Sequence, residues 1–247
     1  MTEKAPHPIG LGLTLFYSSM VLVFYVLVQN AILMHFFQQR PESTETQEEY
    51  AAIMKLLVND ATVLSTGIIL GGMSAILFLV LLIRFRKVDV KQHLMLRPFL
   101  YRDLFNWLLV LIAFSVIFTL IAWLVSHETP DFMLKIWASR DSTILLLLAI
   151  VIAAPVFEEC LFRGFLFTGV QNSHLGTGAA IVISSAFWTL IHTQYGSFEL
   201  ITLFILGIVL AMSRIASGSL YVPIILHASN NLFAVLEMAL FTKNVAQ

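Results

Sequence analysis

Residues 144–167 read ILLLLAIVIAAPVFEECLFRGFLF, an apolar run long enough to cross a membrane that contains two adjacent acids and one base. An ionisable group at the centre of a bilayer costs about 2.5–3.5 kcal/mol on insertion scales, so three in one span indicate a function. Glu159 and Arg163 are four residues apart and share a helical face, where they partly neutralise each other. Glu158 points roughly 100° away and has no partner within its own helix. An unpaired intramembrane carboxylate marks a candidate functional site.

The whole chain has the composition of an integral membrane protein. Of its 247 residues 59% are hydrophobic and 12% are charged, whereas a soluble domain carries about 25% charged residues. The net charge of −1 and the lack of a basic tract argue against a nucleic-acid partner. The single cysteine, Cys160, excludes an intramolecular disulfide and a cysteine metal cluster.

Apolar runs predict an all-α fold, a multi-pass transmembrane helical bundle of seven or eight spans. We expect amino-terminal spans without a recognised motif in residues 1–141 and a catalytic core in residues 142–241. Pro155 lies inside the overlong fourth run, where a kink or a split into two spans would give the eighth. The seven runs are Ile9–Met34, Ala61–Ile83, Leu104–Val125, Ser142–Gln171, Gly178–Tyr195, Phe198–Ile215 and Leu220–Phe241.

The connectors predict an orientation. Residues 84–102 contain six basic side chains, whereas residues 38–60 are net acidic, with Glu42, Glu45 and Asp60 among the acids. The positive-inside rule therefore places the basic connector and the amino terminus in the cytoplasm. Seven spans would leave the carboxyl terminus outside, and eight would reverse that. The short chain without a targeting signal favours a bacterial inner (plasma) membrane.

Polar residues in the last three spans extend the candidate site. Trp188 and His192 are four residues apart, as are His227 and Asn231, so each pair shares one helix face. A carboxylate, two imidazoles and an amide could together hydrolyse an amide bond. Taken singly, such residues also serve as hydrogen-bond partners between helices. Straight helices would place His192 toward the outer face, so convergence with Glu158 requires a bent fourth helix or a fifth helix that begins deeper.

The spacing resembles the three motifs of the CAAX-protease and bacteriocin-processing (CPBP, or ABI) family of intramembrane endopeptidases, relatives of the type II CAAX prenyl proteases. The resemblance covers residues 144–233, and Trp188 departs from it by replacing the usual phenylalanine. The motifs are Glu158-Glu159-xxx-Arg163, Trp188-xxx-His192 and His227-xxx-Asn231. The resemblance implies three pairs of roles: water activation by Glu158 and His192, oxyanion stabilisation by His227 and Asn231, and support or substrate positioning by Glu159 and Arg163.

The resemblance leaves the question of a metal open, because the family has also been described as metalloproteases. Glu158, His192 and His227 would make a three-ligand zinc set with an open position. Against this set, Asn231 is a poor zinc ligand, and no carboxylate is evident as a partner for the second ring nitrogen of either histidine. We therefore expect a glutamate-dependent hydrolase that requires no cofactor, with zinc or another divalent ion as the alternative.

The expected partners are membrane lipid and a peptide or protein substrate with a membrane-associated segment. The alternative functions are a non-catalytic immunity or scaffold protein and a proton-relay transporter on the same framework.

Overall fold

A computed structural model describes residues 9–40 and 46–245, with side chains up to residue 240. Within these residues the regular elements are helices and no strand occurs, which confirms the predicted all-α fold. The longer helices are α1 (Leu11–Gln38), α3 (Ala61–Phe85), α5 (Tyr101–Leu124), α10 (Gly176–Leu190), α11 (Ser197–Ser217) and α12 (Tyr221–Val245). The connecting helices are α2 (Gln47–Val58), α4 (Val90–His93) and α6 (Asp131–Ala138).

The fourth hydrophobic run forms one helix from Thr143 to Gln171 whose winding changes along its length. Pro155 does not split it, because it occupies the first turn of an α-helical stretch that directly follows a π-helical turn. The helix is made of α7 (Thr143–Leu147), the π-helical η1 (Leu148–Ala153), α8 (Ala154–Glu158), the π-helical η2 (Glu159–Leu166) and α9 (Phe167–Gln171). One continuous helix thus corresponds to each of the seven predicted runs.

The surface of the bundle suits a lipid environment. Six of the described helices are long and apolar enough to cross a bilayer, and α10 is a shorter apolar helix. Large apolar side chains are exposed on the outer faces, among them Leu77, Leu109 and Ile117. A water-facing surface seldom exposes so many apolar groups. The chain is therefore an integral membrane protein.

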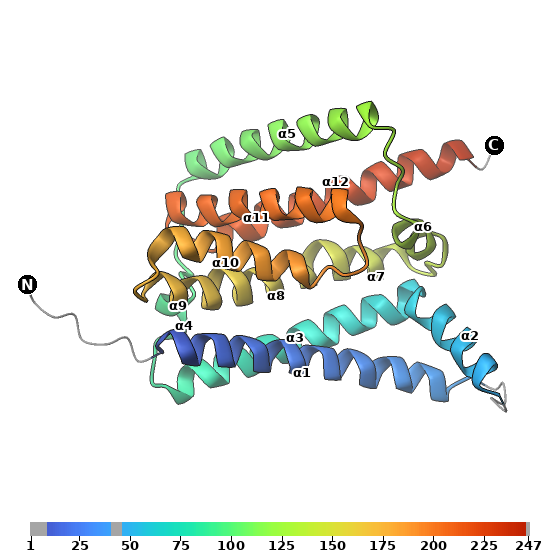
Figure 1. Cartoon of the computed structure of the whole chain (residues 1–247), viewed down its shortest axis with the longest axis horizontal. Coiled ribbons are helices and arrows are strands. Elements are labelled where there is room, and N and C mark those ends of the chain that lie inside the picture. Colours follow the sequence, from blue (N-terminus) through green and yellow to red (C-terminus); the bar gives the residue numbers. More distant parts are fainter. Residues whose placement is uncertain (1–8, 41–45, 246–247) are drawn as a thin grey trace, which may run out of the picture.

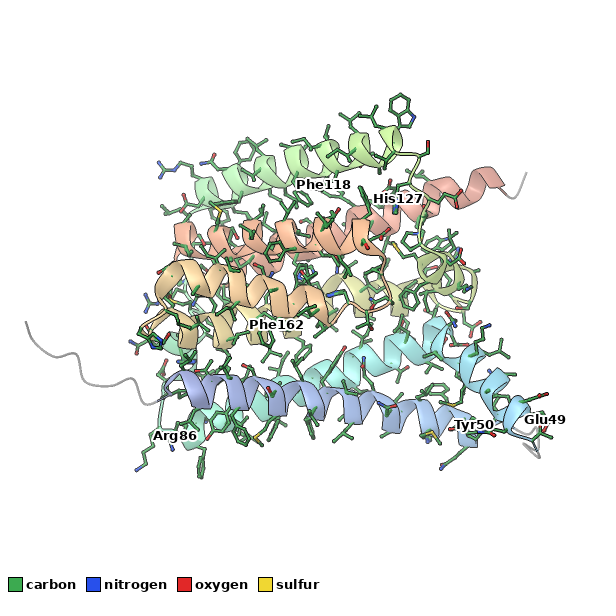
Figure 2. All side chains as sticks on the ribbon, in the orientation of Figure 1. Glu49, Tyr50, Arg86, Phe118, His127 and Phe162 are labelled. Atoms are coloured by element: carbon green, nitrogen blue, oxygen red, sulfur yellow. The ribbon has the colours of Figure 1, made fainter. Side chains whose placement is uncertain are left out.

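The fourth hydrophobic run lies in the middle of the bundle. Helices α1 and α3 pack on one side of it, and α10, α11 and α12 pack on the other, with α5 outermost (Figure 1). Phe157, Phe162 and Phe165 project from this run and are at most 1% exposed. Figure 2 shows Phe162 inside the bundle, between α10 and α1. Every neighbouring helix can therefore contribute a side chain to a site at Glu158.

The two ends of the bundle differ in charge. Arg86 lies at the end that carries α4, whereas Glu49 and Tyr50 lie at the opposite end (Figure 2). The basic and the acidic connectors thus lie at opposite ends, and the positive-inside rule predicts that the basic end is cytoplasmic. Glu42 and Glu45, like the termini at residues 1–8 and 246–247, lie outside the described residues, and the sidedness of the membrane stays a prediction.

Candidate active site

A buried ion pair forms the base of the site, as the spacing of Glu159 and Arg163 predicts. Both side chains are 0% exposed, and Arg163 Nη1 donates to Glu159 Oε1 over 2.9 Å. Arg163 Nη2 donates to the Gly207 carbonyl of α11 over 3.3 Å, and its guanidinium lies 4.4 Å from the centre of the Trp188 ring. The pair is desolvated completely, so its stability depends on these additional contacts.

His227 of α12 completes this buried group. Its Nδ1 lies 2.9 Å from Glu159 Oε1, and the side chain is 3% exposed. Because a carboxylate oxygen accepts, Nδ1 carries the proton and donates it. The sequence-based expectation that no carboxylate partners a histidine ring nitrogen was wrong for His227. The two residues are 68 positions apart in the chain and lie on different helices. The spacing within one helix cannot reveal such a contact.

Glu158 faces the opposite ring nitrogen of the same histidine. His227 Nε2 lies 3.9 Å from Glu158 Oε2, a separation at which one water can contact both atoms. The Glu158 side chain is 12% exposed, so it is sheltered but reachable. The indole N–H of Trp188 donates to the same carboxylate oxygen. Glu158 has no partner in its own helix, as expected, and receives its partners from α10 and α12.

His192 reaches the cluster through Trp188. Its Nδ1 donates to the Trp188 carbonyl over 2.8 Å, which leaves Nε2 as the free nitrogen. The Trp188 ring is 0% exposed and meets both imidazoles edge-on, His192 at 5.2 Å and His227 at 5.1 Å between ring centres. Helix α10 ends at Leu190, before the predicted Tyr195. His192 therefore lies just beyond the helix, in contact with the Trp188 ring, and its convergence with Glu158 stays a prediction.

Asn231 is oriented by a backbone carbonyl that Pro155 leaves free. In η1 the N–H of Ala154 bonds to the Ala149 carbonyl, five residues back. The same pattern would pair the Ile150 carbonyl with residue 155, but proline has no N–H. Asn231 Nδ2 donates to that carbonyl over 2.9 Å. One of the two amide hydrogens is thereby used, and the other remains for a ligand.

Two aromatic residues extend the site beyond the predicted residues. Trp188 belongs to the second motif, and its N–H also binds Glu158. Tyr195, in the connector after α10, stacks on His192 with ring centres 6.1 Å apart. Burial and the negative charges of Glu158 and Glu199 raise the pKa of Tyr195 to about 12. Its hydroxyl therefore stays protonated at neutral pH and can donate a hydrogen bond.

The three residues considered as zinc ligands do not converge as a metal site requires. Among the described residues, no group of three His, Cys, Asp or Glu side chains is placed to hold a metal ion. Glu158 and His227 lie close enough to share an ion, and His192 Nδ1 is held by the Trp188 carbonyl. The expected hydrolase without a cofactor stays a prediction.

Comparison with known proteins finds a family to which this site is similar. Residues 140–233 match the family described as type II CAAX prenyl endopeptidase Rce1-like. The match covers less than half of the chain. All six predicted site residues lie within it, and the resemblance predicted from the three motifs is confirmed.

A curated relative is similar to part of the chain. An Escherichia coli protein, described as an uncharacterized 24.3 kDa protein, is 36% identical over 100 residues, which are 39% of this chain and 46% of the relative. The alignment spans less than half of the relative. No solved structure matches the chain.

Proposed function

We propose that the chain is an intramembrane endopeptidase of the CAAX-protease type, which hydrolyses a peptide bond in a membrane-associated peptide or protein. The observation that carries the proposal is the sheltered Glu158 carboxylate facing His227 Nε2 at 3.9 Å. The Rce1-like match at residues 140–233 supports the same reaction class. Glu159 and Arg163 would hold this arrangement rather than contact substrate, since both are 0% exposed.

Glu158 would act as the general base. Its carboxylate takes a proton from a water as the water oxygen bonds to the carbonyl carbon of the scissile peptide. His192, whose Nδ1 is fixed on the Trp188 carbonyl, accepts a hydrogen bond at Nε2 from the second O–H of that water, and this hydrogen stays on the oxygen that joins the carbonyl carbon. When the C–N bond breaks, Glu158 returns the proton to the leaving nitrogen. The atoms balance as one water consumed for one peptide bond.

His227 and Asn231 would stabilise the oxyanion. In this role His227 would carry a proton on both ring nitrogens, as an imidazolium. Such an imidazolium donates Nδ1–H to Glu159 and directs Nε2–H toward the reacting carbonyl. Asn231 supplies its second amide hydrogen, since the first is held by Ile150. Preorganised donors of this kind are worth about 10²–10³-fold in rate each.

A proton relay is the second candidate, because the contact between Glu158 and His227 also suits proton transfer. Cleavage in ¹⁸O-labelled water separates the two. The reconstituted protein is incubated with farnesylated CAAX peptides and with a library of unprenylated apolar peptides. An endopeptidase leaves one ¹⁸O atom in each new carboxyl terminus, detected by mass spectrometry. Proton flux into sealed vesicles with intact peptides would instead establish the relay.

Pro155→Ala is expected to lower the cleavage rate by about tenfold, part of the 10²–10³-fold that an oxyanion donor contributes. The new N–H at residue 155 can bond to the Ile150 carbonyl and so release the Asn231 amide. Since a helical hydrogen bond is gained, the melting temperature should not fall. The control compares the single variant Asn231→Ala with the double variant Pro155→Ala/Asn231→Ala, and these two should cleave at equal rates. A further loss in the double variant would show that Pro155 acts by another route.

A further inference from the structure

A second polar cavity lies away from the candidate active site, at the basic end of the bundle. It has a volume of about 450 Å³ and opens between the connector after α3, the end of α9 and helix α11. Its lining carries basic groups and neutral hydrogen-bonding groups: Lys87, Arg97, Arg214, Gln92, Gln171 and Asn172. None of these residues belongs to the three motifs.

Arg214 is the unusual member of this cavity. Its side chain is 2% exposed, and among the described residues no acidic group forms an ion pair with it. Nη2 donates to Thr168 Oγ1 over 2.6 Å, and the guanidinium lies 4.3 Å from the centre of the Phe167 ring. Nε is buried without a hydrogen-bond partner in the described structure. A buried cation with a spare donor requires an anion to compensate it.

The walls of the cavity are fixed by hydrogen bonds to the connector backbone. Thr168 Oγ1 donates to the His93 carbonyl over 3.1 Å, and the N–H of Leu220 donates to the Met95 carbonyl over 2.9 Å. Lys87 and Met95 adopt left-handed backbone conformations, with φ of 56° and 59°. Conformations of this kind persist where the surroundings hold them. The cavity is thus preformed and does not require a ligand to shape it.

The charge of the cavity is positive. Lys87, Arg97 and Arg214 line it together with a single acid, Asp89. The Asp89 carboxylate already accepts the N–H of Gln92 over 2.6 Å, at the start of α4. Arginine guanidinium groups bind phosphoryl oxygens through paired N–H donors. Basic pockets between transmembrane helices at the cytoplasmic face are also where lipid headgroups bind.

We propose that this cavity binds a phosphoryl group, supplied either by the headgroup of an anionic phospholipid or by free phosphate. Arg214 contacts the phosphoryl oxygens from within, and Lys87 and Arg97 contact them from the rim. The site is independent of peptide hydrolysis, because it shares no residue with the cluster around Glu158.

Lipid and phosphate titrations of the purified full-length chain test this site. The melting temperature is followed in mixed micelles with phosphatidylglycerol, with phosphatidylcholine, or with sodium phosphate against sodium chloride at equal ionic strength. Phosphatidylglycerol is expected to raise the melting temperature, and phosphatidylcholine is not. Lys87→Gln with Arg97→Gln should weaken that binding by roughly 30-fold.

A matched pair on the same connector provides the control. Arg84→Gln with Lys91→Gln removes the same charge from exposed residues that do not line the cavity, and it should leave binding unchanged. If sodium phosphate alone stabilises the protein and displaces the lipid, the phosphoryl site stands and its ligand is soluble. An equal loss of binding affinity in the two double variants, or no rise in melting temperature with either lipid or phosphate, would overturn the proposal. Glu158→Gln should bind as the wild type does, whatever its effect on cleavage.

Discussion

Glu158→Gln is expected to lower the rate of peptide cleavage by about 10²–10⁴-fold without unfolding the protein. A general base contributes about 10²–10⁴-fold, and glutamine cannot take the proton of the attacking water. The amide keeps the size of the side chain and an oxygen to accept the Trp188 N–H. Because Glu158 is partly exposed and lies outside the buried ion pair, the melting temperature in detergent should change little. Turnover of a cleaved peptide, measured in liposomes at saturating substrate, gives the rate.

Glu237→Gln is the matched control for this experiment. Glu237 is an exposed acid of α12, so its loss should leave cleavage at the wild-type rate. A Glu158→Gln protein that folds, inserts and cleaves normally would rule out Glu158 as the base. A variant that loses cleavage but still shuttles protons across vesicles would separate the two activities at this residue.

The seven apolar segments and their order could be predicted from the sequence, because hydropathy records which segments avoid water, whereas the connecting helices α2, α4 and α6 were not predicted. The ends of these segments could not. The predicted fifth run extends to Tyr195, since Ile191 is as apolar as the helix before it, but α10 ends at Leu190. Hydropathy has no information on the depth at which a helix stops. That depth decides whether His192 can share a site with Glu158.

The members of the candidate site could also be named from the sequence, but several of their contacts could not. The pairing of Glu159 with Arg163 follows from the helical repeat. The contact between His227 and Glu159 depends on how two distant helices are rotated against each other. The position of Asn231 depends on a π-helical turn next to Pro155. Such turns arise from tertiary packing and have no reliable sequence signature.

The amino-terminal helices carry no recognised motif, yet they hold the central helix in place. Tyr25 of α1 stacks on Phe157, the residue before Glu158, with ring centres 4.5 Å apart. A Cβ atom on Gly169 would lie 2.6 Å from the Thr14 Cβ, so α1 approaches α9 as closely as two helices can. The close approach explains why a glycine is needed there. We infer that α1 supports the site through packing.

Arg163→Met and Glu159→Gln are each expected to destabilise the protein by about 3–5 kcal/mol, because each leaves a buried charge without its partner. The double variant leaves no unpaired charge at these two positions and should recover most of the lost stability. It should not recover cleavage, since His227 then lacks the carboxylate that binds Nδ1. Reversible unfolding in mixed micelles measures the free energies of all four proteins, and their differences give the coupling energy of the pair.

The exposed pair Asp131 and Lys135 of α6 is a control with the same spacing. Their charged atoms lie 3.8 Å apart with side chains 87% and 55% exposed. Because water screens both charges, Asp131→Asn and Lys135→Met should each change stability by less than about 0.5 kcal/mol. Equal effects at the two pairs would mean that the Glu159–Arg163 contact is solvated in the membrane. A large coupling energy at the buried pair alone would show that the paired charges of Glu159 and Arg163 stabilise the fold. A loss of cleavage in a variant of either residue could then be assigned to chemistry only after its stability has been measured.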